Sequence, residues 1–469
     1  MALSLSRVPF HRSLPQGTLI CVRTYANSPP GQQSPFRIQN VKNTGTSKNK
    51  KAFSRKNRIG AFRSMTPSSL TVPVLQPSPN SSLSSVPSFK PELMTENMIG
   101  QVVAFSQTPN DPIKYFGTPK NMLLEFRLLS KRCSVIRNIT VFTAEELDSA
   151  AAEPSHKTRY VLTGPSGCGK SFLLLQSVQY CLAKGWIVIY IPRAKTTVNS
   201  TTTHTYDLRT QTYLQPNYAQ QTLRRILEVN SANLETLTLR EGLNYDRRSF
   251  SSGTTLAQLA SAGSKDAVIS SVVLETLLNE LSRQSKIPVL LAVDDFQAIY
   301  NQKTAYRDPH FSAIRPYHLA IPRFILEFAS GKRSFPKGAI LGALTAMDPA
   351  FPVTNELIDE LNLPGLHPRS PYSKRSKILQ EYARGLMNLP VPEEFSPREA
   401  ASVFETWMRD NALSAPGNDE LFLAKYTESA GNPKAFVWQG ILGTLEGAAP
   451  VVNQNTPWPQ LREGRIVVQ

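Results

Sequence analysis

A glycine-rich segment, residues 164–171, reads Gly-Pro-Ser-Gly-Cys-Gly-Lys-Ser and carries the clearest chemistry in the sequence. Its spacing fits the phosphate-binding pattern G-x-x-x-x-G-K-[ST], in which glycines let successive backbone N–H groups surround a phosphate. The lysine of this pattern can reach the β- and γ-phosphates, and the hydroxyl that follows it can ligate Mg²⁺. The segment therefore predicts that the chain binds a nucleoside diphosphate or triphosphate. The candidate nucleotide-binding residues in it are Gly164, Gly167, Cys168, Gly169, Lys170 and Ser171.

A run of apolar residues at 289–293 ends in two acids, Asp294 and Asp295. This run resembles a Walker B strand, whose first acid holds Mg²⁺ directly or through water. We therefore predict that Asp294 and Ser171 are the metal ligands. Asp295 stands where an ATPase usually carries the glutamate that polarises water, so it is the candidate catalytic residue.

Two further polar residues are candidates for nucleotide contact. Thr345 ends an apolar run that begins at residue 339, and the same strand end faces the γ-phosphate in AAA+-like folds. Lys434 ends the segment 429–434, Ser-Ala-Gly-Asn-Pro-Lys, which resembles an element of AAA+ lid domains. Plain alternatives carry equal weight: a buried strand that simply ends in threonine, and a turn that only caps a helix.

Short apolar segments at 160–163 and 186–191 flank the glycine-rich segment and predict buried strands. Between them, residues 172–182 predict a helix with one apolar face, and Gly185 is placed to end it. Strand, loop and helix in this order put a phosphate at a helix N-terminus, where the helix dipole and free N–H groups favour anions. This context disfavours the alternative that a glycine-rich turn precedes Lys-Ser by chance.

The stretch between residues 191 and 289 is far longer than one crossover between strands requires. Helical patterns at 217–229 and 266–285 predict an inserted helical element over the nucleotide, without a second sheet. Further helices are predicted at 120–132, 376–387, 397–410, 419–428 and 433–444.

Two absent motifs narrow the class of nucleotide-binding protein. No Asn-Lys-x-Asp occurs, and residues 294–297 read Asp-Asp-Phe-Gln, which is not Asp-x-x-Gly. The chain therefore lacks the guanine-reading and switch motifs of Ras-like GTPases, and its preference between guanine and adenine stays open. The expected fold class is α/β: a P-loop NTPase of AAA+/STAND type with a parallel sheet, a helical insertion and a C-terminal helical lid domain.

The formal net charge of +17 is concentrated in the N-terminal part of the chain. The first 91 residues hold 13 Lys and Arg and no Asp or Glu, so the remaining 39 basic and 35 acidic residues nearly balance. Residues 1–25 combine Arg and Ser without acids, which is typical of a mitochondrial transit peptide; an ordinary basic tail is the alternative. Six basic residues within 48–58 favour contact with RNA phosphates, although a nuclear localisation signal or a solubilising arm has the same composition.

Composition and pattern divide the chain into five parts. The predicted parts are a transit peptide at 1–25, a disordered basic tail at 26–95, a leading segment that packs on the core at 96–155, the nucleotide-binding core at 156–370 and a helical domain at 371–469. No apolar run is long enough for a transmembrane helix, so membrane insertion is not expected. The four cysteines lack metal-ligand spacing and predict free thiols in a reducing compartment.

Four segments together resemble the death-associated protein 3 family over about residues 95–460; they are 164–171, 185–192, 293–295 and 338–341. Segment 185–192, Gly-Trp-Ile-Val-Ile-Tyr-Ile-Pro, is the most specific of the four, and the resemblance is to a fungal member. The resemblance implies a structural component of the mitochondrial small ribosomal subunit, in its head and in the mitochondrial matrix, that supports mitochondrial translation. Its partners would be small-subunit rRNA and other mitoribosomal proteins rather than copies of itself. It also implies bound GTP or GDP with Mg²⁺, hydrolysed slowly or not at all, with ATP as an open alternative.

Two other functions stay open at this level. An active AAA+/STAND ATPase, acting as an initiator or signalling switch, would use Asp295 and would need an arginine finger, for which Arg323 and Arg333 are candidates. A plain nucleic-acid-binding protein would explain the basic tail but would leave the glycine-rich segment without a role.

Overall fold

A computed structural model of the chain describes residues 82–446, except 246–247, 346–347, 365–371, 373, 411–412 and 414–416. These residues belong to one unit of the chain, Ser64–Gln469. The predicted transit peptide and the basic segment at 48–58 lie outside the described residues.

A five-stranded parallel sheet forms the centre of this unit, with the strand order β11-β3-β10-β9-β4. Its strands are β3 (Arg159–Thr163), β4 (Ile187–Ile191), β9 (Val289–Asp294), β10 (Gly338–Ala343) and β11 (Met387–Pro390). Because the strands are parallel, their carboxyl ends lie along one edge, which is where ligands bind in open α/β sheets. Strand β10 lies between β3 and β9, so the segments that follow these three strands are neighbours at that edge.

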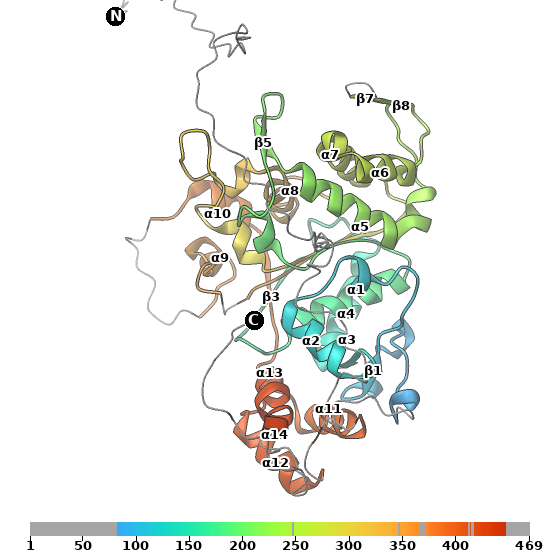
Figure 1. The fold of residues 1–469 in the computed structure, drawn as a ribbon, viewed down its shortest axis with the longest axis vertical. Helices are drawn as coiled ribbons and strands as arrows, with labels where there is room; N and C mark the ends of the chain where they lie inside the picture. Colours follow the sequence, from blue (N-terminus) through green and yellow to red (C-terminus); the bar gives the residue numbers. More distant parts are fainter. Residues whose placement is uncertain are drawn as a thin grey trace, which may run out of the picture. The chain divides into compact units, whose positions relative to one another are not determined.

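The predicted strands next to the glycine-rich segment are confirmed, and so is the helix between them. Strands β4, β9 and β10 are buried along their whole length, as expected for apolar strands covered on both faces. Helix α4 (Lys170–Ala183) packs against these three strands, with α3 (Asn138–Ala150) beside it, while α5 (Pro216–Glu235) packs against β4 (Figure 1). The described chain is thus a mixed α/β fold that is compatible with a P-loop NTPase.

The inserted stretch contains three helices that pack on one another: α5, α6 (Leu256–Lys265) and α7 (Ala267–Arg283). The helical patterns at 217–229 and 266–285 are confirmed, and α6 is an additional helix in the Gly- and Ser-rich stretch between them. The prediction that this stretch holds no second sheet is wrong, because it contains two small antiparallel hairpins. Strands β5 (Thr205–Asp207) and β6 (Thr212–Leu214) precede α5, and β7 (Leu243–Tyr245) and β8 (Arg248–Phe250) lie between α5 and α6. Gly263 explains the close packing of α6, since a Cβ there would lie 2.7 Å from side-chain atoms of both Leu223 and Val273.

The folded part begins earlier than the boundary predicted after residue 95. Leu83, Phe89 and Met94 are buried, and the backbone forms short 3₁₀ helices at Ser82–Ser85, Pro91–Leu93 and Glu96–Met98. The prediction of disorder is therefore wrong for residues 82–95, because three apolar side chains in a polar segment reach a surface supplied by distant parts of the chain. Strand β1 (Val102–Ala104) then pairs antiparallel with β2 (Cys133–Val135), with α1 (Pro112–Tyr115) and α2 (Lys120–Leu128) between them.

The predicted helix at 376–387 is wrong over its last residues. Helix α10 (Lys377–Ala383) ends before Gly385, which has a φ of 78°, and the chain continues as β11 beside β3. The boundary predicted at residue 371 therefore separates a strand from its own sheet. A four-residue strand of mixed polarity has no local signature, because its partner lies more than 220 residues earlier in the chain.

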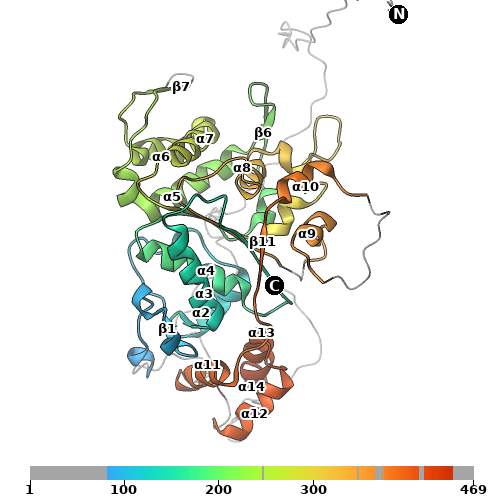
Figure 2. The same cartoon turned by 180° about the vertical axis from the view of Figure 1, so that it is seen from behind.

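The remaining C-terminal helices gather at one end of the unit, opposite α5–α7 (Figures 1 and 2). They are α11 (Pro397–Arg409), α12 (Asp419–Glu428), α13 (Pro433–Ala435), the π-helical segment Phe436–Ile441 and α14 (Gly443–Glu446). Their apolar side chains share one hydrophobic core with residues 83–135, called the N-terminal segment from here on. This core includes Leu83, Ala104, Leu129, Val135, Phe404, Trp407, Phe436 and Ile441. These helices are therefore packed against the N-terminal segment. Among the described residues, no helix is long and apolar enough to span a membrane.

Candidate nucleotide-binding site

The glycine-rich loop leaves β3 and enters α4 in a conformation that requires its glycines. Gly164, Gly167 and Gly169 have φ values of 130°, 86° and 102°, which L side chains rarely adopt. Close neighbours add a second requirement: a Cβ at Gly164 would lie 2.9 Å from the carbonyl oxygen of Val391 and one at Gly167 would lie 2.5 Å from Oδ1 of Asn432. The loop is therefore held by contacts with C-terminal segments.

Lys170 begins α4 and keeps its ammonium group inside the loop. Its Nζ donates hydrogen bonds to the carbonyl oxygens of Gly164, at 2.8 Å, and Pro165, at 2.6 Å. The side chain of Cys168 is fully buried, with Sγ 3.5 Å from Nζ of Lys170, so this cysteine can offer only backbone groups to a ligand. A positive charge beside the N-terminus of α4 is a suitable environment for an anion.

Ser171 and Asp294, the two predicted metal ligands, are brought together across the sheet edge. Burial raises the pKa of Asp294 to about 7, and the neighbouring carboxylate of Asp295 adds to the rise, while hydrogen bonds from Ser171 and from the Asp295 N–H oppose it. The backbone N–H of Asp295 lies 2.9 Å from Oδ1 of Asp294. A hydroxyl and a carboxylate on adjacent elements fit Mg²⁺, which takes few protein ligands and keeps several waters.

Asp295 is held in a special backbone conformation beside a lysine. Its φ of 56° and ψ of 38° place it in the left-handed region. Its carboxylate lies 3.8 Å from Nζ of Lys195, which also pairs with Asp348 at 3.2 Å. The structure therefore places the candidate catalytic acid at the site, within an ion-pair network.

Thr345 follows β10 and lies between the loop and the two acids. The side chain of Gln297 donates to the carbonyl oxygen of Thr345, at 2.9 Å, and accepts from its N–H, at 3.0 Å. Gln297 is fully buried and thus fixes the backbone of Thr345 relative to β9. Thr345 can be predicted from its place at the end of an apolar run, whereas Gln297 cannot, because it lies 48 residues from Thr345 in the chain.

Lys434 belongs to a turn that packs directly on the loop. The N–H of Lys434 donates to the carbonyl oxygen of Gly167, at 3.1 Å, and Nδ2 of Asn432 donates to that of Ser166, at 3.0 Å. The other side-chain atom of Asn432, Oδ1, accepts from the N–H of Ala435 at 3.2 Å and so caps α13. The turn therefore caps α13 and also packs on the loop, while contact of the Lys434 side chain with a nucleotide stays a prediction.

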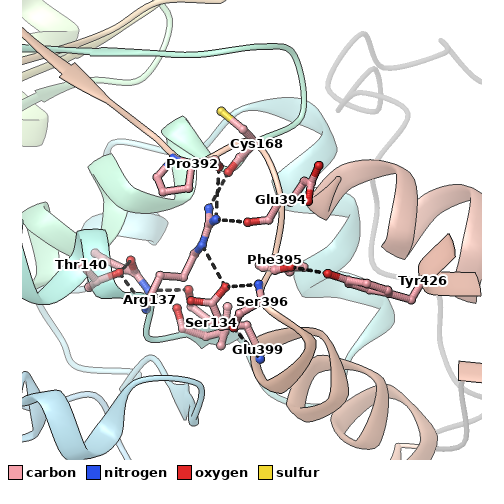
Figure 3. Close-up of polar contacts among 12 residues, drawn as sticks. Ser134, Arg137, Thr140, Cys168, Pro392, Glu394, Phe395, Ser396, Glu399 and Tyr426 are labelled. Atoms are coloured by element: carbon pink, nitrogen blue, oxygen red, sulfur yellow. Dashed lines mark hydrogen bonds and ion pairs between the residues drawn. The ribbon is translucent and has the colours of Figure 1, made fainter. Parts of the chain in front are cut away.

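Arg137, which no sequence motif marks, joins the loop to the C-terminal helices (Figure 3). Its guanidinium group donates to the carbonyl oxygens of Cys168, at 2.8 Å, Glu394, at 2.6 Å, and Pro392, at 3.1 Å. Its Nε lies 3.5 Å from Oε2 of Glu399 on α11. Burial lowers the pKa of Arg137, and Glu399 opposes that change. A single arginine with no motif around it gives no sequence signal, because its partners are distant in the chain.

A cavity of about 720 Å³ connects these groups. Its lining includes Lys170, Ser171, Asp294, Asp295, Thr345 and Lys434, together with residues of the N-terminal segment, α11 and the C-terminal helices. No lining residue comes from α5, α6 or α7, so the prediction that the inserted helices lie over the nucleotide is wrong. The cover is instead formed by the N-terminal segment and the C-terminal helices, which share the core described above.

The two proposed arginine fingers are engaged elsewhere. Arg323 and Arg333 both pair with Glu327 on α8 (Ala320–Ala329), at 2.8 Å and 3.6 Å. Neither lines the cavity, whose lining arginines are Arg137 and Arg193. Arg193 donates to the carbonyl oxygen of Thr118 at 2.9 Å.

The Asp294→Asn variant is expected to stabilise the ligand-free protein in a pH-dependent way. The folded-state pKa of Asp294 is raised from 3.8 to about 7, so wild-type stability falls as the pH rises through this range and then levels off. Asparagine removes this loss, so its advantage over aspartate should grow by about 2–3 kcal/mol between pH 5 and pH 8, since one pKa unit corresponds to about 1.36 kcal/mol. Urea unfolding of both proteins at pH 5 and pH 8, with chelator present, measures it. A difference that does not grow between these pH values would contradict the raised pKa.

The Gly167→Ala variant tests the contact between the loop and the Asn432 turn. Its Cβ meets Asn432 at 2.5 Å, whereas Gly253 has a similar φ of 90° and nothing within 4 Å. Both substitutions carry backbone strain, but only the first adds an overpacking cost of about 1–3 kcal/mol. Urea unfolding should therefore show a larger loss for Gly167→Ala than for the control Gly253→Ala. Equal decreases in the free energy of unfolding for the two variants would mean that Asn432 and its turn move away from the new Cβ without destabilising the protein.

The chain is similar to known proteins over most of this folded unit. The family model described as "Mitochondrial ribosomal death-associated protein 3" matches residues 134–438. "Small ribosomal subunit protein mS29" of Neurospora crassa is 26% identical over 329 residues, covering 67% of each chain. The protein of the same name from Schizosaccharomyces pombe is 23% identical over 328 residues, covering 68% of this chain and 67% of its own. That from Bos taurus is 26% identical over 236 residues, covering 48% and 58%.

Proposed function

Because the chain belongs to the mitochondrial ribosomal death-associated protein 3 family, we propose that it is a structural protein of the small subunit of the mitochondrial ribosome, and that its loop holds a purine nucleotide. Family membership places the protein in the mitochondrion. As a small-subunit protein it would lie among other mitoribosomal proteins and rRNA. The match over residues 134–438 carries the ribosomal part of this proposal.

The convergence of Lys170, Ser171 and Asp294 at one sheet edge supports the nucleotide. The loop N–H groups and Lys170 would hold the phosphates, and Ser171 and Asp294 would hold Mg²⁺, which neutralises phosphate charge. GTP or GDP is the proposed ligand, with ATP or ADP as the alternative. The insertion of β10 between β3 and β9 supports the AAA+/STAND assignment, since it places Thr345 between the phosphate loop and the acids. Helices α11–α14 would act as the lid.

Slow or absent hydrolysis fits the surroundings of Asp295. Its carboxylate faces Lys195, and both proposed arginine fingers are paired with Glu327 on α8. The nucleotide would then act as a structural ligand that stabilises the native state by binding only to it.

Sedimentation tests the ribosomal role. The full chain, tagged at its C-terminus and expressed in mitochondria, should sediment with the small subunit through a sucrose gradient at low and at moderate salt. Treatment with EDTA, which separates ribosomal subunits, should leave it on the small subunit. A protein that sediments free of the subunit under both conditions would overturn the proposal.

The second candidate function, an active ATPase that acts as a switch, rests on the presence of Asp295 beside the loop. Phosphate release by the purified protein would support it if Asp295→Asn abolished the activity while binding persisted. Release at the rate of a protein-free control would leave the structural role as the better account.

A further inference from the structure

Two segments of the chain, which follow β4 and β9, do not contribute to the lining of the cavity. One is the β5–β6 hairpin, which lies at the end of the unit away from α11–α14 (Figures 1 and 2). The other is the loop 303–315, which lies between the short helix Phe296–Tyr300 and α8 in the chain. Together they are called the hairpin surface from here on, defined as residues 204–214 and 303–315.

Contacts between the hairpin and the loop join them into one surface. Nε2 of His204 lies 3.0 Å from the carbonyl oxygen of Arg307, and the rings of His204 and Tyr306 lie 5.1 Å apart. A small buried core lies beneath them; it consists of Tyr306, Ile314 and Leu319, with Tyr213 packed against it. The hairpin and the loop therefore present their exposed side chains from a common support.

Three apolar side chains of the hairpin surface face solvent. They are Tyr206, Leu208 and Phe311, whose exposed fractions are 52%, 83% and 85%. Phe311 has a φ of 60°, in the left-handed region that bulky residues rarely adopt. Its N–H donates to the carbonyl oxygen of Asp308 at 2.9 Å, which holds the residue in this conformation. The fold thus bears backbone strain to present a ring that it does not bury, a combination that is typical of ligand-binding positions.

The charge that the hairpin surface presents to solvent is positive. Its basic side chains are all exposed; they are Arg209, Lys303, Arg307 and Arg315. Its two acids, Asp207 and Asp308, both accept hydrogen bonds within their own turns. Asp207 accepts from the N–H of Arg209 at 3.1 Å, and Asp308 accepts from the N–H groups of His310 and Ser312 at 2.9 Å and 2.8 Å. The acids therefore serve the turns, while the four cations accompany the exposed rings along the same two segments.

We infer that the hairpin surface binds single-stranded RNA, with unpaired bases stacked on Tyr206 and Phe311 and the phosphates held by the four basic side chains. Single-stranded RNA exposes flat base faces beside negative phosphates, so it matches aromatic rings and cations that lie together. A protein segment that made only apolar contacts would bury these cations without counter-charges, at a high cost in free energy. The inference does not depend on nucleotide binding in the cavity, whereas the source of the RNA, the small-subunit rRNA, rests on the proposed ribosomal role.

Fluorescence anisotropy of the purified full-length protein with a labelled oligouridine measures this contact. The double variant Tyr206→Ser with Phe311→Ser should bind roughly 10-fold or more weakly than wild type, since each stacked base contributes a factor of about 5 to 150. The control Phe142→Ser with Leu423→Ser removes two exposed apolar side chains of α3 and α12 and should bind like wild type. All variants keep the basic N-terminal tail, so its contribution is the same throughout.

The salt dependence of oligouridine binding tests the phosphate contacts separately. Arg209→Gln with Arg307→Gln should make the slope of log affinity against log salt concentration shallower by about 1.4, because each phosphate contact to a single strand contributes about 0.7. An unchanged slope would contradict the role of these two arginines.

Ultraviolet crosslinking of purified small subunits tests the contact in the particle and needs no variant. After digestion, mass spectrometry should find nucleotides attached to peptides that contain Tyr206 or Phe311. Hairpin-surface peptides that carry no nucleotide, or that are crosslinked only to a neighbouring protein, overturn the inference, as does unchanged oligouridine binding by the folded double variant without the two rings. A protein that binds oligouridine through the two rings yet sediments free of the small subunit overturns the ribosomal role and leaves the RNA-binding surface standing.

Discussion

Replacing Arg137 by alanine is expected to lower the free energy of unfolding by about 3–5 kcal/mol, the usual range for breaking a buried ion pair from one side. The substitution leaves Glu399 buried without its partner and removes the donor to three backbone carbonyl groups of the loop and of residues 392–394. It also removes the guanidinium group that lies 5.2 Å from the ring centre of Phe395. Urea unfolding, followed by circular dichroism at pH 7, measures the loss.

Two comparison variants make the Arg137 result specific. Arg409→Ala breaks an exposed pair with Glu405 on α11 and should change stability by about 1 kcal/mol or less. The double variant Arg137→Ala with Glu399→Gln should lose less than the sum of its two single variants, because the second substitution removes the unpaired charge. A loss below about 1 kcal/mol for Arg137→Ala would show that the loop and the C-terminal helices do not depend on this residue.

The Lys170→Ala variant is expected to weaken binding of the Mg²⁺–nucleoside diphosphate roughly 10-fold to 100-fold, since hydrogen bonds to charged groups contribute about 1.5–3 kcal/mol each. Ligand at 100 times its dissociation constant should stabilise wild type by about 2.7 kcal/mol, and the variant correspondingly less. Thermal melting with and without the nucleotide measures both quantities. The ligand-free variant should also melt lower, because Lys170 bonds two carbonyl groups of its own loop.

Lys184→Ala is the matched control for this experiment. Lys184 caps the opposite end of α4 and pairs with Asp148 at 3.4 Å, away from the cavity. It should keep the wild-type response to nucleotide. A Lys170→Ala protein that melts like wild type both with and without nucleotide would remove the basis for a structural nucleotide at this loop.

The glycine-rich segment, the strands beside it and the acids at the end of β9 follow from the sequence alone. Each is a local pattern: residues of one type at short spacing, read from apolar runs and glycine positions. Such patterns act through backbone preference and burial of adjacent side chains, so they do not depend on distant parts of the chain. The same is true of the family resemblance, which rests on contiguous motifs.

Only the tertiary structure decided what surrounds the loop. Arg137 contacts carbonyl groups 255 and 257 residues away, and Glu125 meets Trp438 across 313 residues. Strand β11 pairs with β3, and the C-terminal helices share a core with the N-terminal segment from Leu83 onward. Single polar residues and a four-residue strand have no periodicity that a sequence pattern could show. They contribute to the free energy of unfolding only when the folded chain brings their partners into contact. For that reason the loop could be identified from its residues, whereas the groups that hold it and face its ligand could not.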